Sequence, residues 1–137
     1  MTAFELDAKL AADTAEVAQW DLCRVLLMND ANYPWLILVP ARAGLRDLHD
    51  LAADDLAAMT AEIVRASTAL EDLFDPVKLN VAALGNQVPQ LHVHVIARRT
   101  DDPAWPKPVW GAAPARPYDD DALSTRIAQL REVFQRF

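Results

Sequence analysis

The chain has 137 residues, which is enough for one domain with its own hydrophobic core. Its net charge of −7 argues against a general nucleic-acid binder, because affinity for a nucleic-acid backbone depends on many cationic contacts. The single cysteine, Cys23, excludes an intrachain disulfide, and no apolar run approaches the ~18–20 residues that span a bilayer. Because residues 1–10 also lack the basic and apolar regions of a signal peptide, we expect a cytoplasmic protein that does not associate with a membrane.

The first part of the chain predicts a weak helix followed by a β-hairpin. Residues 1–20 are amphipathic with weak helical character. The apolar runs 22–28 and 35–39 are typical of strands, and Asn29 and Asp30 form a turn signal that ends the first run. We expect the two strands to pair in an antiparallel hairpin, joined by a loop longer than a two-residue turn.

The rest of the chain predicts a long helix, two more strands and a last helix. Residues 53–74 carry an apolar stripe at helical spacing, formed by Leu56, Met59, Ile63, Leu70 and Leu73. Strands are expected over 78–84 and 90–98, and five prolines make 101–117 irregular. A helix over 121–137 follows. This order predicts an α+β domain in which an antiparallel sheet carries the long helix and the C-terminal helix.

The strand predicted over 90–98 carries an unusual row of polar residues. Side chains alternate along a strand, so Gln90, His92 and His94 are expected on one face. The intervening residues are apolar and are expected to enter the core: Leu91, Val93 and Val95. Three polar groups in a row gain nothing from packing, and each costs free energy if it is buried without a partner. The row therefore indicates either a solvent-exposed face or a functional site.

The residues alone leave three interpretations of the two histidines open. They could form the polar outer face of a half-exposed strand. They could bind a metal ion, although the only other histidine, His49, and the single cysteine, Cys23, lie on separate segments. In the third interpretation His92 attacks a phosphorus atom, because imidazole can form a labile phosphoramidate that water then hydrolyses.

The third interpretation is supported by a resemblance to the histidine-triad (HIT) family. The HIT signature is His-φ-His-φ-His-φ-φ, where φ is apolar, and residues 90–96 match it at two of three histidines and at all four apolar positions. Gln90 replaces the first histidine. The context is also similar, since the expected neighbours occur in order over roughly residues 20–111: a strand ending in Asn29, a loop with Pro34, Gly85 before two polar residues, and a Trp-Pro segment near Trp105.

The resemblance implies a HIT-like fold over residues 1–137 and an active site built around the signature. It implies a nucleotidyl hydrolase or transferase that acts on the α-phosphate of a nucleoside mono- or polyphosphate conjugate. His92 matches the nucleophile, which forms a covalent nucleotidyl-histidine. His94 matches the histidine that binds the phosphate oxygens. We expect the Gln90 side chain to orient His92 without taking part in bond-making.

Other positions match nucleotide-binding residues of the family. Asn86 and Gln87 match groups that donate to the phosphate or to the leaving group, and Asn29 matches the residue that holds the ribose hydroxyls. We expect Arg98, at the end of the histidine strand, to add positive charge for the nucleotide. The resemblance also implies a homodimer that pairs through the long helix and an adjacent strand, with no metal or cofactor in the site chemistry.

Two departures from the family put the rate of catalysis in doubt. Gln90 replaces one histidine, and Leu36 aligns with a second histidine that many members carry just after the loop proline. These two histidines partner each other behind the nucleophile in those members. Their joint absence keeps an alternative function open, a nucleotide-binding protein with little or no turnover that serves sensing or partner binding.

Overall fold

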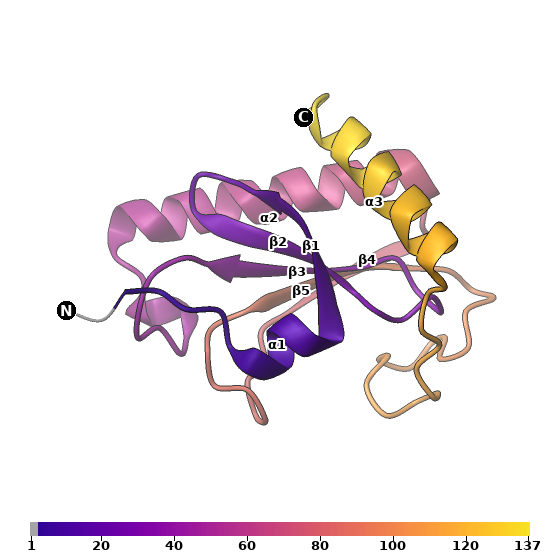
Figure 1. Ribbon diagram of the computed structural model, residues 1–137, viewed down its shortest axis with the longest axis horizontal. Helices are drawn as coiled ribbons and strands as arrows, with labels where there is room; N and C mark the ends of the chain where they lie inside the picture. Colours follow the sequence, from indigo (N-terminus) through magenta and orange to yellow (C-terminus); the bar gives the residue numbers. More distant parts are fainter. Residues whose placement is uncertain (1–2) are drawn as a thin grey trace.

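A computed structural model describes residues 3–137, in which five strands form one antiparallel sheet (Figure 1). The first two residues of the domain expected over 1–137 lie outside the described residues. The strands lie in the order β1-β2-β3-β5-β4. In chain order the elements are α1 (Ala8–Asp13), β1 (Thr14–Gln19), β2 (Cys23–Met28), β3 (Trp35–Pro40), a 3₁₀ turn (Leu48–Asp50), α2 (Ala53–Phe74), β4 (Lys78–Ala82), β5 (Val93–Arg98) and α3 (Asp120–Phe134).

The α+β class expected from the sequence is confirmed, and α2 has the bounds that its apolar stripe predicted. The stripe itself is only partly correct, because Leu56 is 40% exposed whereas Met59 and Leu70 are buried. Glu62, which is not part of the predicted stripe, is also buried on the sheet-facing side of α2. Its carboxylate accepts hydrogen bonds from the main-chain N–H groups at the start of β2, at 3.0 Å and 2.9 Å, which explains how a charged side chain is tolerated there.

The weak helix expected over residues 1–20 is mostly wrong. Residues 1 and 2 lie outside the described residues, and over 3–20 only α1 is helical. The carboxylate of Asp7 caps it by accepting from the N–H groups of Lys9 and Leu10. From Thr14 onward the chain forms β1, which pairs with β2 and buries Val17. Pairing with a neighbouring strand overrides a weak helical propensity, because each pair satisfies main-chain donors and acceptors.

The other elements begin and end close to their expected positions. β4 ends at Ala82 instead of residue 84, and β5 begins at Val93 instead of residue 90. Gly85 has a φ of 77°, a left-handed conformation that turns the chain between these two strands. The last helix, α3, covers Asp120–Phe134 instead of 121–137, with Asp119 as its N-cap.

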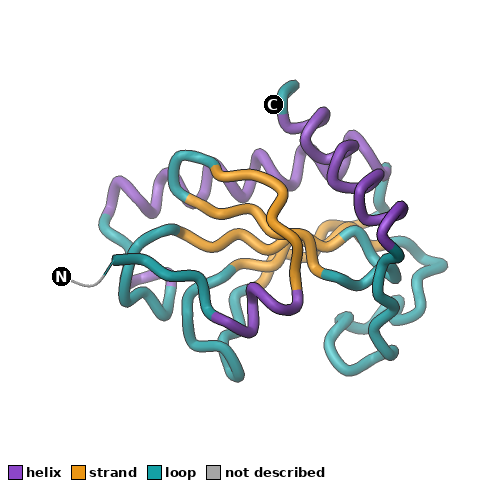
Figure 2. The backbone as a smooth tube through the Cα atoms, viewed as in Figure 1, coloured by secondary structure: helices purple, strands orange, loops and turns teal. Residues whose placement is uncertain are grey.

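The sheet has two buried faces, each covered by different elements. On one face Leu36 and Val95, which pair across β3 and β5, pack with residues of α2. On the other face Trp35, Ile37 and their neighbours pack with α1 and with the irregular segment before α3. Figure 2 shows α2 and α3 as helices on one side and loops gathered at the opposite side. His94 pairs with Ile37 and therefore belongs to the second face.

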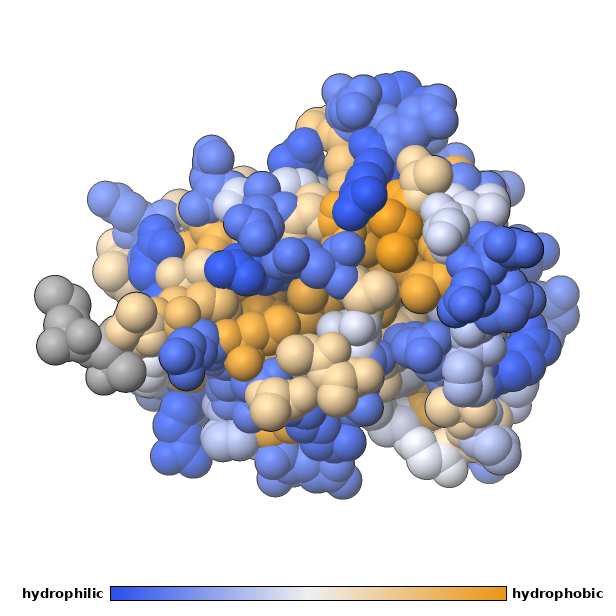
Figure 3. All heavy atoms as spheres, in the orientation of Figure 1, coloured by the Kyte–Doolittle hydropathy of each residue, from blue (hydrophilic) through white to orange (hydrophobic). Residues whose placement is uncertain are grey.

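In the view of Figure 3, hydrophilic side chains cover most of the rim and apolar surface gathers in the middle. Within residues 3–137, no helix combines the length and the apolar character that a bilayer-crossing segment requires.

Candidate functional site

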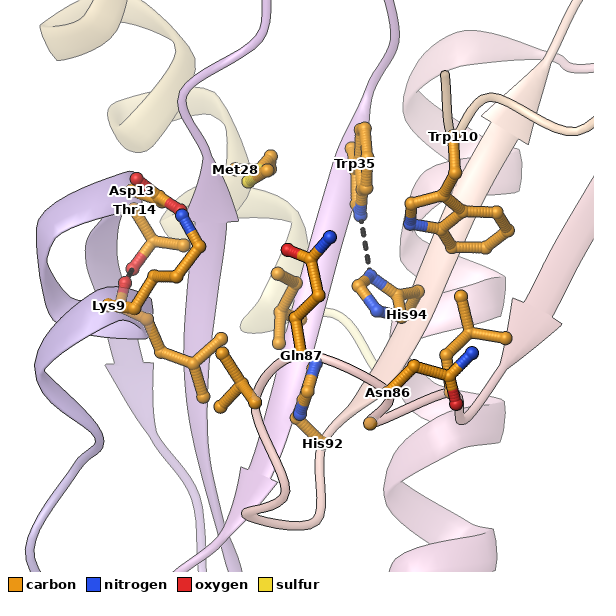
Figure 4. A pocket seen from close by; sticks show the side chains of 15 residues that line it. Lys9, Asp13, Thr14, Met28, Trp35, Asn86, Gln87, His92, His94 and Trp110 are labelled. Atoms are coloured by element: carbon orange, nitrogen blue, oxygen red, sulfur yellow. Dashed lines mark hydrogen bonds and ion pairs between the residues drawn. The ribbon is translucent and has the colours of Figure 1, made fainter. Parts of the chain in front are cut away.

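A cavity of about 310 Å³ lies on the second face of the sheet, beside the histidines (Figure 4). Strands β3 and β5 supply its floor, and α1 supplies Lys9 and Asp13. The loop between β4 and β5 and the indole of Trp110 complete the walls. His92 and His94 both line the cavity, so the sequence pattern placed them correctly on one face. The site is thus assembled from segments far apart in the sequence.

His92 lies just before β5 and is only 7% exposed. Its Nδ1 atom is 2.7 Å from the main-chain carbonyl oxygen of Gln90. A carbonyl oxygen can only accept a hydrogen bond, so Nδ1 carries the proton in the neutral ring. The Nε2 atom of His92 then keeps a free electron pair, which is the form that a nucleophile needs.

His94 is held in the opposite tautomer. Its Nδ1 atom is 3.0 Å from the indole Nε1 of Trp35, and both side chains are buried. An indole N–H can only donate, so Nδ1 of His94 must be the acceptor and Nε2 must carry the proton. Burial, and next the nearby His92, lower the pKa of His94 to about 4. His94 is therefore a neutral hydrogen-bond donor at physiological pH.

The two imidazoles are neighbours, with ring centroids 5.0 Å apart and an interplanar angle of 69°. One ring offers an electron pair on Nε2 and the other offers an N–H. A nucleophile beside a donor suits attack on a phosphoryl group, because negative charge collects on the oxygens of the transition state. Trp110 packs edge-on against His94 at a centroid distance of 5.0 Å and limits the access of water to that ring.

The loop between β4 and β5 brings two further expected residues to the site. Asn86 and Gln87 line the cavity and are exposed at its rim (Figure 4). Their side-chain amides can donate to a bound oxyanion. The apolar wall of the cavity includes Met28 and Ile37, which are suited to a flat, weakly polar group.

The expected contact between the Gln90 side chain and His92 is not found. The Oε1 atom of Gln90 accepts from the N–H of Asp7 at 2.9 Å, and its Nε2 donates to the carbonyl of Glu5 at 2.8 Å. The side chain therefore binds the N-terminal segment, and only its main-chain carbonyl reaches His92. The reason is that β5 begins at Val93, so the strand alternation used in the prediction does not extend back to Gln90.

Asn29 and Arg98 also lie apart from the histidines in this structure. The Oδ1 atom of Asn29 accepts from the N–H of Tyr118 at 2.9 Å, which anchors the segment before α3. Arg98 is 1% exposed, and its guanidinium is hydrogen-bonded to Asp102, Asn80 and the carbonyl of Lys107. Neither side chain lines the cavity. Asn29 is thus bound by the segment before α3, and Arg98 by β4 and by the loop that follows β5.

Leu36 was expected to occupy the site of a missing partner histidine, and this expectation is wrong. Leu36 is fully buried among the residues that pack against α2, on the face away from the cavity. Its neighbour Trp35 occupies the cavity face instead. Every residue of β3 is buried, so alternation of polar and apolar residues gave no sign of which face each one joins. The sequence reasoning therefore missed Trp35 as a site residue.

The residues that sequence offered as further metal ligands lie away from the cavity. His49 is exposed on the 3₁₀ turn, with its side chain 85% exposed. Cys23 is buried in the core that α2 covers, and burial, and next the charge of Glu62, raise the pKa of its thiol. Within residues 3–137, no three His, Cys, Asp or Glu side chains cluster as metal ligands would.

The sequence matches the family described as HIT domain over residues 9–101. A histidine triad protein from Bradyrhizobium japonicum is similar in structure, with a TM-score of 0.94 and 45% identity over 97% of this chain and 99% of that one. A second, from Marinobacter aquaeolei, has a TM-score of 0.95 and 43% identity over 98% of both chains. A third, from Sinorhizobium meliloti, has a TM-score of 0.92 and 43% identity over 94% of this chain and 96% of that one. No curated protein matches the chain significantly.

Proposed function

Because this chain belongs to the histidine-triad (HIT) family, we propose that it is a nucleotidyl hydrolase or transferase. Its substrate is a nucleoside mono- or polyphosphate conjugate, such as a dinucleoside polyphosphate or a nucleoside phosphoramidate. One observation carries the proposal: two adjacent histidines line one cavity, and their Nδ1 atoms have opposite partners, the Gln90 carbonyl oxygen for His92 and the Trp35 indole N–H for His94. The unprotonated Nε2 of His92 and the Nε2–H of His94 can therefore both reach the same phosphoryl group.

In the first step the electron pair on Nε2 of His92 forms a bond to the α-phosphorus. The bond from phosphorus to the leaving group breaks, and the leaving group takes its electron pair and then a proton from water. The Nε2–H of His94 donates to a phosphate oxygen and keeps its proton throughout. The imidazolium that forms on His92 keeps its Nδ1–H bond to the Gln90 carbonyl.

In the second step water, or another acceptor, adds to phosphorus and loses a proton. The N–P bond breaks and its electron pair returns to His92. Asn86 and Gln87 support both steps from the rim of the cavity by donating to the phosphate or to the leaving group. The nucleoside lies against the apolar wall that includes Met28 and Ile37.

The test replaces His92 with asparagine and follows the hydrolysis of an adenosine phosphoramidate and of a diadenosine polyphosphate. We expect the rate to fall by roughly three orders of magnitude or more, with nucleotide binding retained. Rapid acid-free quenching and intact mass spectrometry should reveal one nucleotidyl group on the wild-type chain and none on His92→Asn. His49→Asn is the control, because this histidine is exposed and does not line the cavity. A near-normal rate for His92→Asn would exclude the covalent mechanism.

A second candidate function is nucleotide binding with little or no turnover, for sensing or partner binding. The observation that favours it is the position of the Gln90 side chain, which is bound to Glu5 and Asp7 instead of facing the nucleophile. An amide also cannot take up a proton near neutral pH, so it supplies no second base behind His92. Tight binding of a nucleoside monophosphate with no turnover of either substrate would select this function.

A further inference from the structure

We propose that Trp35 is a positioning residue, whose indole N–H fixes His94 in the one tautomer that presents an N–H to the cavity. The inference rests on the proposed function for its catalytic meaning, but its structural content can be tested without any substrate. Trp35 is the neighbour of Leu36, which the family resemblance aligned with a missing histidine.

The contact follows from the strand register. Ile37 pairs with His94 and Trp35 pairs with Ile96, so Trp35 lies diagonally across from His94 on the same face of the sheet. The indole nitrogen reaches Nδ1 of His94 at 3.0 Å (Figure 4), and the two rings are 5.7 Å apart at their centroids. Trp35 is 4% exposed and His94 is 6% exposed, so water does not compete effectively for this hydrogen bond.

The chemistry of the indole makes the choice of tautomer one-sided. Tryptophan has a donor and no acceptor, whereas a histidine or an amide at the same position could bond to either tautomer. If Nδ1 of His94 carried the proton, two N–H groups would face each other and both would lose their partner in a buried site. The same conflict opposes the doubly protonated ring. Trp35 therefore favours the neutral Nε2–H form over both alternatives.

The charged groups near His94 do not reverse this preference. His92 is its titratable neighbour from the β5 side, and a positive charge there opposes protonation of His94. From α1, Lys9 and Asp13 line the same cavity, but they form an ion pair with each other at 3.0 Å. Trp110, from the segment before α3, is uncharged. Burial and the indole donor together keep His94 neutral at the pH of a cell.

Trp110 provides a matched control, because it is a second tryptophan against the same imidazole. Its ring centroid is 5.0 Å from that of His94, with an interplanar angle of 78°. Of these two indoles, only that of Trp35 forms a hydrogen bond to the His94 imidazole within residues 3–137. Changing either tryptophan to phenylalanine removes an indole N–H beside His94, but only Trp35→Phe removes a donor to Nδ1.

The experiment records two-bond ¹H–¹⁵N correlations of the histidine side chains in uniformly ¹⁵N-labelled protein. The chain has only three histidines, so variants of His49 and His92 assign the His94 signals by elimination. In wild-type protein at pH 7 we expect a single His94 tautomer with the proton on Nε2. Trp35→Phe should give a mixture of tautomers and a raised His94 pKa, whereas Trp110→Phe should leave both unchanged.

Turnover supplies the second readout. Trp35→Phe should lower kcat by ~10-fold with little change in KM, because the phosphate-binding N–H is then present only part of the time.

An Nδ1–H or doubly protonated His94 in the wild-type protein would overturn the inference, and this result does not depend on whether Trp35→Phe folds. An unchanged tautomer in a folded Trp35→Phe would also overturn it. If the tautomer behaves as expected but His92→Asn keeps its activity, the proposed function fails while the role of Trp35 in fixing the tautomer stands.

Discussion

Replacing Arg98 with methionine should destabilise the fold without weakening nucleotide binding by the folded molecules. The Arg98 guanidinium donates to the Asp102 carboxylate at 2.8 Å and 3.1 Å, to Asn80 at 2.8 Å and to the carbonyl of Lys107 at 2.8 Å. Its side chain is 2% exposed and that of Asp102 is 6% exposed. Removing one partner of such a buried pair leaves the other charge without compensation and typically costs ~3–5 kcal/mol.

The structure places the cost at the lower end of that range, at about 3 kcal/mol. After the substitution, Asp102 still accepts hydrogen bonds from the main-chain N–H groups of Arg99, Ala104 and Trp105. Burial alone would raise the pKa of Asp102, but the hydrogen bonds from Arg98 and these N–H groups lower it overall. The carboxylate therefore keeps part of its stabilisation in the variant.

Urea unfolding followed by far-UV circular dichroism measures this loss, which corresponds to a fall in Tm of roughly 10 °C for a chain of this length. Arg99→Met is the control, because Arg99 is 56% exposed and its ion pair with Asp101 should contribute less than ~1 kcal/mol. Binding of a nucleoside monophosphate by Arg98→Met should stay within ~2-fold of wild type under folding conditions. Unchanged unfolding combined with a large loss of binding would refute this reasoning and restore the nucleotide-binding role that the sequence suggested for Arg98.

Three further predictions follow from other residues of the structure. The free energy of unfolding should fall by ~3 kcal/mol as pH drops from about 6.5 to 4, because His94 is protonated in the unfolded chain over this range but stays neutral in the folded chain until its pKa of about 4. Chemical unfolding at several pH values should show this dependence of stability on pH, and the dependence should be weaker in His94→Asn. Gln90→Ala should speed amide exchange at Asp7 and lower turnover by ~10-fold or less; a loss of rate as large as that of His92→Asn would show that the glutamine acts on the chemistry. The protein should be a homodimer that pairs through α2 and β4, where the apolar residues Val64 and Val81 are 58% and 48% exposed. Light scattering should give twice the chain mass of 15.2 kDa, and a monomer across micromolar concentrations would contradict this prediction.

The elements with strong periodic patterns could be predicted from the sequence, and those defined by pairing or packing could not. The bounds of α2 followed from its stripe and from Pro76 beyond its end. Both histidines line one cavity, although only His94 lies in β5 and His92 precedes it. β1 was missed because its only fully buried side chain is Val17, which leaves a weak pattern.

Some of the residues expected at the site lie elsewhere in the structure, for physical reasons that act beyond the strand. Arg98 and Gln90 are polar residues beside the signature, but each is bound by a segment distant in the chain or by the following loop. Trp35 and Leu36 could not be distinguished, because a strand buried on both faces is apolar at every position. Which of two neighbours faces the histidines depends on register, and a shift of one residue exchanges the faces.

The two-faced sheet has a consequence for how this protein can change over evolutionary time. Alternate side chains of β3 and β5 face either the helical layer or the cavity, so neighbouring residues contribute either to packing against α2 or to the shape of the cavity. Substitutions at Leu36 or Val95 alter the packing against α2, whereas substitutions at Trp35 or Ile37 alter what the cavity accepts. Pairs of changes on opposite faces that share no partner should have nearly additive effects. Because Trp35 and Ile37 are themselves buried, a substitution that alters the cavity also costs stability. A compensating substitution against α2 can restore that stability without altering what the cavity accepts.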